Sequence, residues 1–233
     1  MDKNKDQYLE IQHVDIAVSA LKSSLGVLPI VGPLMGELVG YTIPNQRFDR
    51  LVKYSIELEK RLGNIDKAIL RLALQNENFT DLMEESLRQA ARSLSDERRE
   101  YIASIIANSL TPENIEFQEA KHVLRILGEL NDIEIIWLRY YLRTSDESDH
   151  KFRQKHEQIL NPPRQFGGIT QNESDKFAFQ ESYKEHLVQL GLLGQDREPV
   201  SVDTNGEVSG AGRVRGYYLT HFGRIVLEQI NLQ

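Results

Sequence analysis

Apolar residues recur every three or four positions over residues 44–130, which is the spacing of one face of an α-helix. The clearest case is residues 44–62, where one side carries Phe48, Leu51, Val52, Ser55, Leu58 and Leu62 and the other sides carry charges. The same pattern predicts further helices over residues 6–24, 65–75, 80–94, 95–110 and 111–130. Short connections favour antiparallel neighbours, so we predict a multi-helix bundle.

The most apolar stretch is residues 26–43, GVLPIVGPLMGELVGYTI. Prolines interrupt it and Glu37 lies inside it, so its uninterrupted helical part is only about 15 Å long, too short to span a bilayer. Gly32, Gly36 and Gly40 are four positions apart and share one helix face, where another backbone can approach closely. Two interpretations stay open: a hairpin buried in the core, or a sheltered hairpin that assembles or enters a membrane interface when triggered.

From residue 132 the pattern changes. In order, the sequence predicts an apolar helix over 133–142, a charged exposed helix over 145–160, a loop over 161–174, a helix over 175–190, strands over 199–202 and 213–219, and a final helix capped by Thr220. Helices followed by a glycine-rich hairpin and another helix are the layout of a winged-helix fold. We therefore predict a mainly α chain, with a helical domain over residues 1–131 and a winged-helix-like domain over residues 132–233.

The charge balance is acidic in both predicted domains. The chain has 233 residues, with 28 basic and 35 acidic side chains and a net charge of −7. Residues 1–131 hold 16 basic and 20 acidic residues, and residues 132–233 hold 12 and 15. This excludes a strongly basic protein that coats nucleic acid. The chain has no cysteine, and its first residues lack the apolar core of a secretory signal, so we expect a cytoplasmic protein.

No motif indicates catalysis. The six histidines are scattered, and the closest pair, His150 and His156, lies on different helix faces. The sequence contains no phosphate-binding loop, dinucleotide fingerprint, nucleophile elbow or zinc-binding HExxH. We predict a non-enzymatic protein with no catalytic, cofactor-binding or metal-ligating residues.

The predicted winged helix offers candidate contacts for nucleic acid. The helix before the hairpin carries Lys176 and Lys184, and the hairpin carries Arg213 and Arg215, two positions apart and therefore on one strand face. Acidic residues dilute this basic surface, and winged helices also bind proteins. We favour protein contact, with a DNA-binding transcriptional regulator as the alternative.

Three runs resemble a known family: LPIVGPLMGELVGYTIPNQRFDRLVKYSIELEKRL, FTDLMEESLRQAARSLSDERREYIASIIANSL and YYLTHFGRIVLEQI. Together they resemble the abortive-infection alpha type of bacterial proteins, over most of the chain from about Leu28 onward. The most distinctive residues are Gly32-Pro33, Ile43-Pro44 and Arg47. The resemblance implies a bacterial or phage-related protein in phage defence, and it implies no active residues.

These observations give one functional expectation. The chain is a non-enzymatic phage-defence protein whose partner is another protein or a second copy, so that a homo-oligomer is one form of it. Gly32, Gly36 and Gly40 form its candidate partner or membrane face, and residues 26–43 would place it at the periphery of a membrane.

Overall fold

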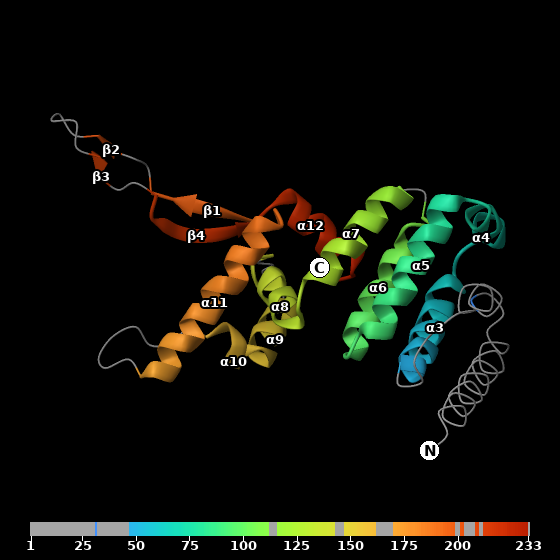
Figure 1. Cartoon of the computed structure of the whole chain (residues 1–233), viewed down its shortest axis with the longest axis horizontal. Coiled ribbons are helices and arrows are strands. Elements are labelled where there is room, and N and C mark those ends of the chain that lie inside the picture. The colour runs from blue at the N-terminus through green and yellow to red at the C-terminus, as the bar shows by residue number, and fades with distance from the viewer. Residues whose placement is uncertain are drawn as a thin grey trace, which may run out of the picture. The chain divides into compact units, whose positions relative to one another are not determined.

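The computed structural model describes residues 31, 47–111, 116–142, 147–161, 170–198, 201–202, 208–209 and 212–232. The chain divides into two compact units, Met1–Gly128 and Glu129–Gln233. The described residues contain ten helices and a C-terminal antiparallel hairpin followed by a helix, so the predicted mainly α class is confirmed (Figure 1). The boundary predicted after Asn131 falls close to the division between the units.

The N-terminal unit consists of helices in its described part. They are α3 (Phe48–Leu62), α4 (Lys67–Leu74), α5 (Glu77–Arg92), α6 (Asp96–Asn108) and α7 (Phe117–Glu129). Their start signals are local: the side chains of Asp66, Asn76 and Ser95 accept backbone N–H groups at the first turns of α4, α5 and α6. The cap predicted at Ser95 is confirmed, whereas α5 begins earlier than expected because Asn76 caps it.

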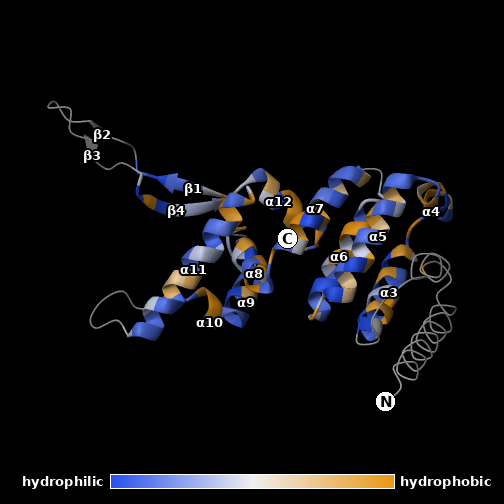
Figure 2. Cartoon of the chain, viewed as in Figure 1, coloured by the Kyte–Doolittle hydropathy of each residue, from blue (hydrophilic) through white to orange (hydrophobic). Residues whose placement is uncertain are grey.

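An apolar core lies between these helices. Hydrophobic and hydrophilic residues alternate around them, as Figure 2 shows. The largest fully buried side chains are Tyr54, Phe79, Leu51, Leu58, Leu62, Leu82, Met83, Ile102 and Ile105. The buried hydroxyl of Tyr54 donates a hydrogen bond to Ser86 Oγ at 2.8 Å, and Ser86 in turn donates to the carbonyl of Met83 at 2.7 Å. Because both buried hydroxyls are hydrogen-bonded, the fold avoids the desolvation cost of an unsatisfied polar group.

The C-terminal unit begins with four helices. They are α8 (Asp132–Tyr140), α9 (Glu147–Lys155), α10 (Glu157–Leu160) and α11 (Gln171–Gln189). The predicted helix over 145–160 is thus two helices. It is also not exposed throughout, because Asp149 is buried, with its Oδ1 3.2 Å from Nη1 of Arg139 in α8. The predicted loop over 161–174 ends earlier than expected, because a capping box between Thr170 and Glu173 starts α11 at Gln171.

The strands follow α11. They are β1 (Leu193–Arg197), β2 (Ser201–Val202), β3 (Val208–Ser209) and β4 (Val214–Leu219). β1 pairs with β4 and β2 with β3, both antiparallel. The sequence predicted β2 and β4 but missed β1 and β3. β3 has only two residues and lies in the stretch predicted as a turn, and β1, LGQDR, is short, polar and contains a glycine. Its partner strand and its backbone hydrogen bonds, rather than its propensity, make it a strand.

The last helix, α12 (His221–Gln229), begins at the predicted cap: Thr220 Oγ1 accepts the N–H of Gly223 at 2.9 Å. Thr220 also donates its N–H to the carbonyl of Leu192 at 3.1 Å. A side chain at Gly223 would overlap that carbonyl, so glycine is required for this close approach. Gly191 has a φ of 73°, the left-handed conformation predicted for the end of the preceding helix.

Most of the apolar segment 26–43 lies outside the described residues, including Gly32, Gly36 and Gly40. Val31 is the exception: its side chain is fully buried, and its N–H donates to Glu59 Oε2 of α3 at 2.7 Å. Among the helices that the structure describes, none combines the length and the apolar character needed to cross a bilayer.

Candidate functional site: the exposed half of α11 and its supports

The first half of α11 is a helix that its own unit leaves uncovered. Residues 171–179 are exposed apart from Glu173, which is partly covered. Phe177 is 38% exposed and Phe179 is 62% exposed. A helix segment with so little packing must be started locally, and the capping box does this: Thr170 Oγ1 accepts the N–H of Glu173 at 3.3 Å, while the Glu173 carboxylate accepts the N–H of Thr170 at 3.0 Å.

Aromatic rings extend this surface along the helix. Phe179 stacks with Tyr183, one turn further on, with ring centroids 6.4 Å apart and an interplanar angle of 26°. Gln180, between them in sequence, points inward and donates to the carbonyls of Ile159 and Asn161 at 2.9 and 3.1 Å. We call residues 171–179 together with Tyr183 the α11 surface; its Phe179–Tyr183 stack is an apolar anchor of the kind that protein interfaces bury.

A polar and aromatic cluster fixes the hairpin to α11 and α8. Lys184 Nζ lies 4.8 Å from the ring centroid of Trp137 and 5.6 Å from that of Tyr217. It also pairs with Glu181 Oε1 at 2.5 Å, and the Tyr217 hydroxyl donates to Glu181 Oε2 at 3.0 Å. Burial, followed by the charge of Glu181, raises the pKa of Tyr217 to about 12, so this hydroxyl keeps its proton well into the alkaline range.

This cluster changes the availability of the predicted nucleic-acid contacts. The Lys184 side chain is only 13% exposed and already occupied by Glu181 and two rings, so it does not offer its charge to a phosphate. Lys176 is exposed on the α11 surface. The four candidate residues are therefore not equivalent: one of the two helix lysines supports the fold of the hairpin.

The two predicted hairpin arginines are both exposed. Arg215 lies 3.5 Å from Glu198 Oε1, an ion pair whose arginine is 58% exposed. The strand register shifts between Asp196 and Arg197, whose partners are Gly216 and Val214, so Arg215 lies at a β-bulge. Because a bulge interrupts the alternation of side chains, the two-residue spacing of Arg213 and Arg215 does not by itself place them on one face.

Tyr218 is a further exposed aromatic residue, on β4. It is 56% exposed, and its ring lies across Gly194 of the paired strand β1. A side chain at Gly194 would overlap this ring, so the glycine leaves the room that the Tyr218 ring occupies. The alternation of β4 places Tyr218 on the strand face opposite that of Tyr217, so it forms a second apolar position and is not part of the α11 surface.

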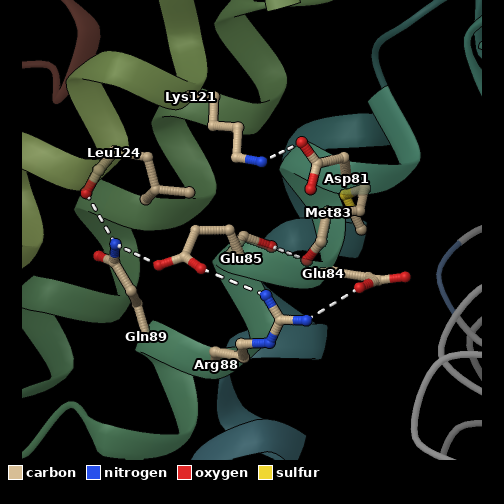
Figure 3. Close-up of polar contacts among 9 residues, drawn as sticks. Asp81, Met83, Glu84, Glu85, Arg88, Gln89, Lys121 and Leu124 are labelled. Atoms are coloured by element: carbon tan, nitrogen blue, oxygen red, sulfur yellow. Dashed lines mark hydrogen bonds and ion pairs between the residues drawn. The ribbon is translucent and has the colours of Figure 1, made fainter. Parts of the chain in front are cut away.

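Polar side chains of the N-terminal unit interact along α5 and, at two places, between α5 and α7. Figure 3 shows Gln89 donating to Glu85 Oε1 at 3.0 Å and to the carbonyl of Leu124 at 2.8 Å, while Arg88 contacts Glu84 and Glu85 and Lys121 pairs with Asp81. Each labelled carboxylate here has a cationic or amide partner. Two of these contacts, Gln89 with Leu124 and Lys121 with Asp81, link α5 to α7. No group of three or more histidine, aspartate or glutamate side chains among the described residues could hold a metal ion.

Comparison with protein-family models found no match, and comparisons with curated proteins and with solved structures found none either.

The sequence indicated the helix that carries the α11 surface but not its exposure. The helix predicted over residues 175–190 contains Phe177, Phe179 and Tyr183. Phe177 and Phe179 are two positions apart, which is about 200° around a helix, so both cannot face the same core. This spacing is the signal that could have identified an exposed phenylalanine.

Proposed function

We propose that this chain is a non-enzymatic bacterial protein of the abortive-infection type, which acts by protein–protein contact through the α11 surface. The observation that carries this proposal is the exposed Phe179, at 62%, stacked on Tyr183 of the same helix. Burying a phenylalanine side chain contributes about 2 kcal/mol, so a partner that covers this stack gains a substantial part of its binding energy. The partner is another protein or a second copy of the chain.

The charges on the C-terminal unit favour protein over DNA. Of the four basic residues that a DNA-binding winged helix would use, Lys184 is held by Glu181 and Arg215 by Glu198. Asp175 and Glu185 add exposed negative charge to the same helix. A DNA-reading surface depends on concentrated positive charge for its affinity, and this helix does not concentrate it.

The element order supports a winged-helix-like C-terminal domain as part of the proposal. Helices α8 to α11, the β1–β4 hairpin and α12 follow one another in the order of that fold. In it, α11 occupies the position of the recognition helix. Because the fold serves both DNA and protein partners, it is compatible with either role.

The cellular role rests on the family resemblance, and we propose phage defence on that basis. Membrane association of residues 26–43 stays part of the proposal, with Gly32, Gly36 and Gly40 as its contact face. Burial of Val31 against α3 supports the sheltered form of this segment, in which it is held in the core until a trigger releases it.

A phage-challenge assay tests the proposal. Bacteria that produce the wild-type chain should show fewer plaques than cells that do not, and Phe179→Ser should restore plaque formation because it removes the anchor from an exposed position. The matched control is Leu94→Ser, which removes an 82% exposed leucine from the N-terminal unit and should keep protection. Both purified variants should keep the wild-type melting temperature. Full protection by Phe179→Ser would refute the role of the α11 surface.

The alternative function is DNA binding by the hairpin. One observation favours it: Arg213 is exposed beside the β1–β4 strand pair, and it makes no ion pair with any residue in the described ranges. Gel-shift titration of the wild type at low salt should then detect binding, and Arg213→Ala with Arg215→Ala should weaken it and flatten its salt dependence. Absence of DNA affinity at low salt would eliminate this alternative.

A further inference from the structure

Strand β4 has an open edge. Among the described residues, it forms a two-stranded sheet with β1 alone. Thr220 donates its N–H to the carbonyl of Leu192, and hydrogen-bonded pairs alternate along an antiparallel ladder. The backbone N–H and C=O groups of Tyr217 and Leu219 therefore point away from β1. Neither of these residues has another backbone hydrogen bond in the part of the chain that the structure describes.

The two strands of this sheet differ in how they discourage pairing with another chain. Proteins commonly protect an open strand edge with charged side chains or proline. β1, LGQDR, ends in polar and charged residues. Residues 216–220, GYYLT, contain no charge and no proline, and they include two tyrosines, which favour strands. The nearest charge on β4, Arg215, is already paired with Glu198 at 3.5 Å. The edge of β4 is therefore suited to pairing with a further strand.

We propose that β4 pairs antiparallel with β4 of a second copy of the chain, about a two-fold axis at Tyr218. In this register, Tyr217 of each copy lies opposite Leu219 of the other, and their outward N–H and C=O groups bond to each other. Tyr218 meets its own copy at a non-hydrogen-bonded position, where cross-strand side chains lie closest. The Tyr218 side chain is 56% exposed, and pairing it with a second tyrosine removes part of that surface from water.

Charge and strand geometry favour a second copy in this register. A two-fold axis brings a segment beside its own copy, so any charge in it would meet a like charge. Residues 216–220 hold no charge, and the paired segments do not repel each other. The neighbouring register, with the axis at Tyr217, would pair Leu219 with Arg215, which lies at the β-bulge and interrupts a regular ladder. The axis at Tyr218 avoids the bulge.

This pairing leaves the α11 surface free. Tyr217, whose hydroxyl bonds to Glu181, lies on the sheet face that α11 covers, and Tyr218 lies on the other face. The two-fold axis is perpendicular to the sheet, so both copies keep α11 on the same side. A dimer therefore presents two α11 surfaces to a partner, which goes beyond the proposed function. A stable interface buries about 800 Å² on each partner, and a short strand edge buries less, so the dimer is weak and reversible.

Disulfide trapping tests the pairing, because the chain contains no cysteine. Tyr218→Cys puts one thiol of each copy at the axis, where the Cα atoms of a non-hydrogen-bonded pair are about 4.5 Å apart, a separation that a disulfide spans. Oxidation of the full chain with copper phenanthroline should convert this variant mainly to a covalent dimer.

Gly216→Cys is the matched control on the same face of the same strand. A Cβ atom at Gly216 meets nothing within 4 Å, but in this register residue 216 lies opposite residue 220 of the second copy, so its thiol does not meet its own copy. Leu94→Cys, at a position 82% exposed in the N-terminal unit, measures oxidation by random collision. If either control forms dimers as fast as Tyr218→Cys, the axis at Tyr218 is refuted.

Analytical ultracentrifugation of the unmodified chain is the second measurement. The wild type should show a monomer–dimer equilibrium that depends on concentration. Tyr218→Lys should weaken association roughly tenfold or more, because the aromatic pair is lost and two ammonium groups meet at the axis. Tyr218→Phe should associate like the wild type, and all variants should keep the wild-type circular dichroism spectrum.

Two results would overturn the proposal. One is a wild type that stays monomeric up to about 1 mM, which leaves less than about 4 kcal/mol for association. The other is Tyr218→Lys that dimerises like the wild type, which would place the contact on another surface. Phe179→Ser should dimerise normally, so failure of the β4 pairing is separate from failure of the α11 surface in the phage assay.

Discussion

The two units of this chain are both mainly helical, but different interactions hold their helices together. In the N-terminal unit, α3 and α5 bury continuous apolar stripes, and Leu58 and Leu82 are fully buried. In the C-terminal unit, the contacts between elements include many charged and aromatic groups, such as Asp149 between two arginines and Lys184 over Trp137. Apolar burial involves no titrating or ionic group, so pH and ionic screening affect it little, whereas they weaken these polar contacts directly. The two units should therefore respond differently to the same perturbations.

The single tryptophan makes this comparison measurable. Trp137 is the only one in the sequence, and it lies in the C-terminal unit with 4% exposure. Its fluorescence reports the unfolding of that unit, while far-ultraviolet circular dichroism reports the helices of both. Each of the following changes is directed at one unit and read with both signals.

The largest effect is expected from Leu58→Ala in α3. Removing a fully buried leucine leaves a cavity and costs about 4 kcal/mol of unfolding free energy. Urea denaturation should show this loss by circular dichroism. Ile56→Ala is the control in the same helix, because Ile56 is 54% exposed and should cost less than about 1 kcal/mol. Similar losses for both variants would contradict an apolar core at Leu58.

A smaller effect is expected from Asp149→Ala in α9. Asp149 accepts from Arg139 at 3.2 Å and from Arg153 at 2.6 Å, and the Arg139 side chain is only 4% exposed. The change leaves a buried guanidinium without this carboxylate and should cost about 3 kcal/mol, seen in the tryptophan signal. Lys151→Ala is the control in the same helix. It breaks the ion pair of Lys151 with Glu147, whose side chains are 71% and 82% exposed, and should change the unfolding free energy by less than about 0.5 kcal/mol. Equal losses of unfolding free energy in Asp149→Ala and Lys151→Ala would show that the buried ion pairs of Asp149 stabilise the fold no more than an exposed pair does.

The smallest effect concerns pH. Because the pKa of Tyr217 is raised from 10 to about 12, the protonated hydroxyl stabilises the folded C-terminal unit. Its contribution is complete below pH 10 and is lost as the pH rises from 10 to about 12. Tyr217→Phe should therefore weaken the alkaline loss of stability seen by Trp137 fluorescence. The same alkaline slope in Tyr217→Phe and in the wild type would rule out this contribution.

Most helices of both units could be predicted from the sequence because their signals are local. Apolar spacing gave α3 and α5 their buried sides, and capping residues such as Ser95 and Thr220 marked helix starts that the structure reproduces. Gly191 likewise indicated where α11 ends. These features depend on neighbours within a few positions, which a single sequence displays directly.

The candidate sites could be predicted less well from the sequence. Lys184 and Lys176 look alike in the sequence, but only the fold brings Trp137 and Tyr217 to Lys184 and occupies its charge. Asp149 lies in a charged run that indicates solvent exposure, yet Arg139, ten positions away, buries it. The strand β1 becomes regular only through its pairing with β4.

The sequence by itself determined the helical class, the positions of most helix boundaries and the change of character near residue 132, because periodicity and capping act over one or two helical turns. The tertiary structure alone decided which of the similar residues are free to act. Exposure of Phe179 and Tyr218, and capture of Lys184 by Glu181 and the aromatic rings, depend on which distant segments cover a side chain. That covering is a property of packing in three dimensions: the spacing of Phe177 and Phe179 indicates that they cannot both face one core, but not which side chain stays uncovered.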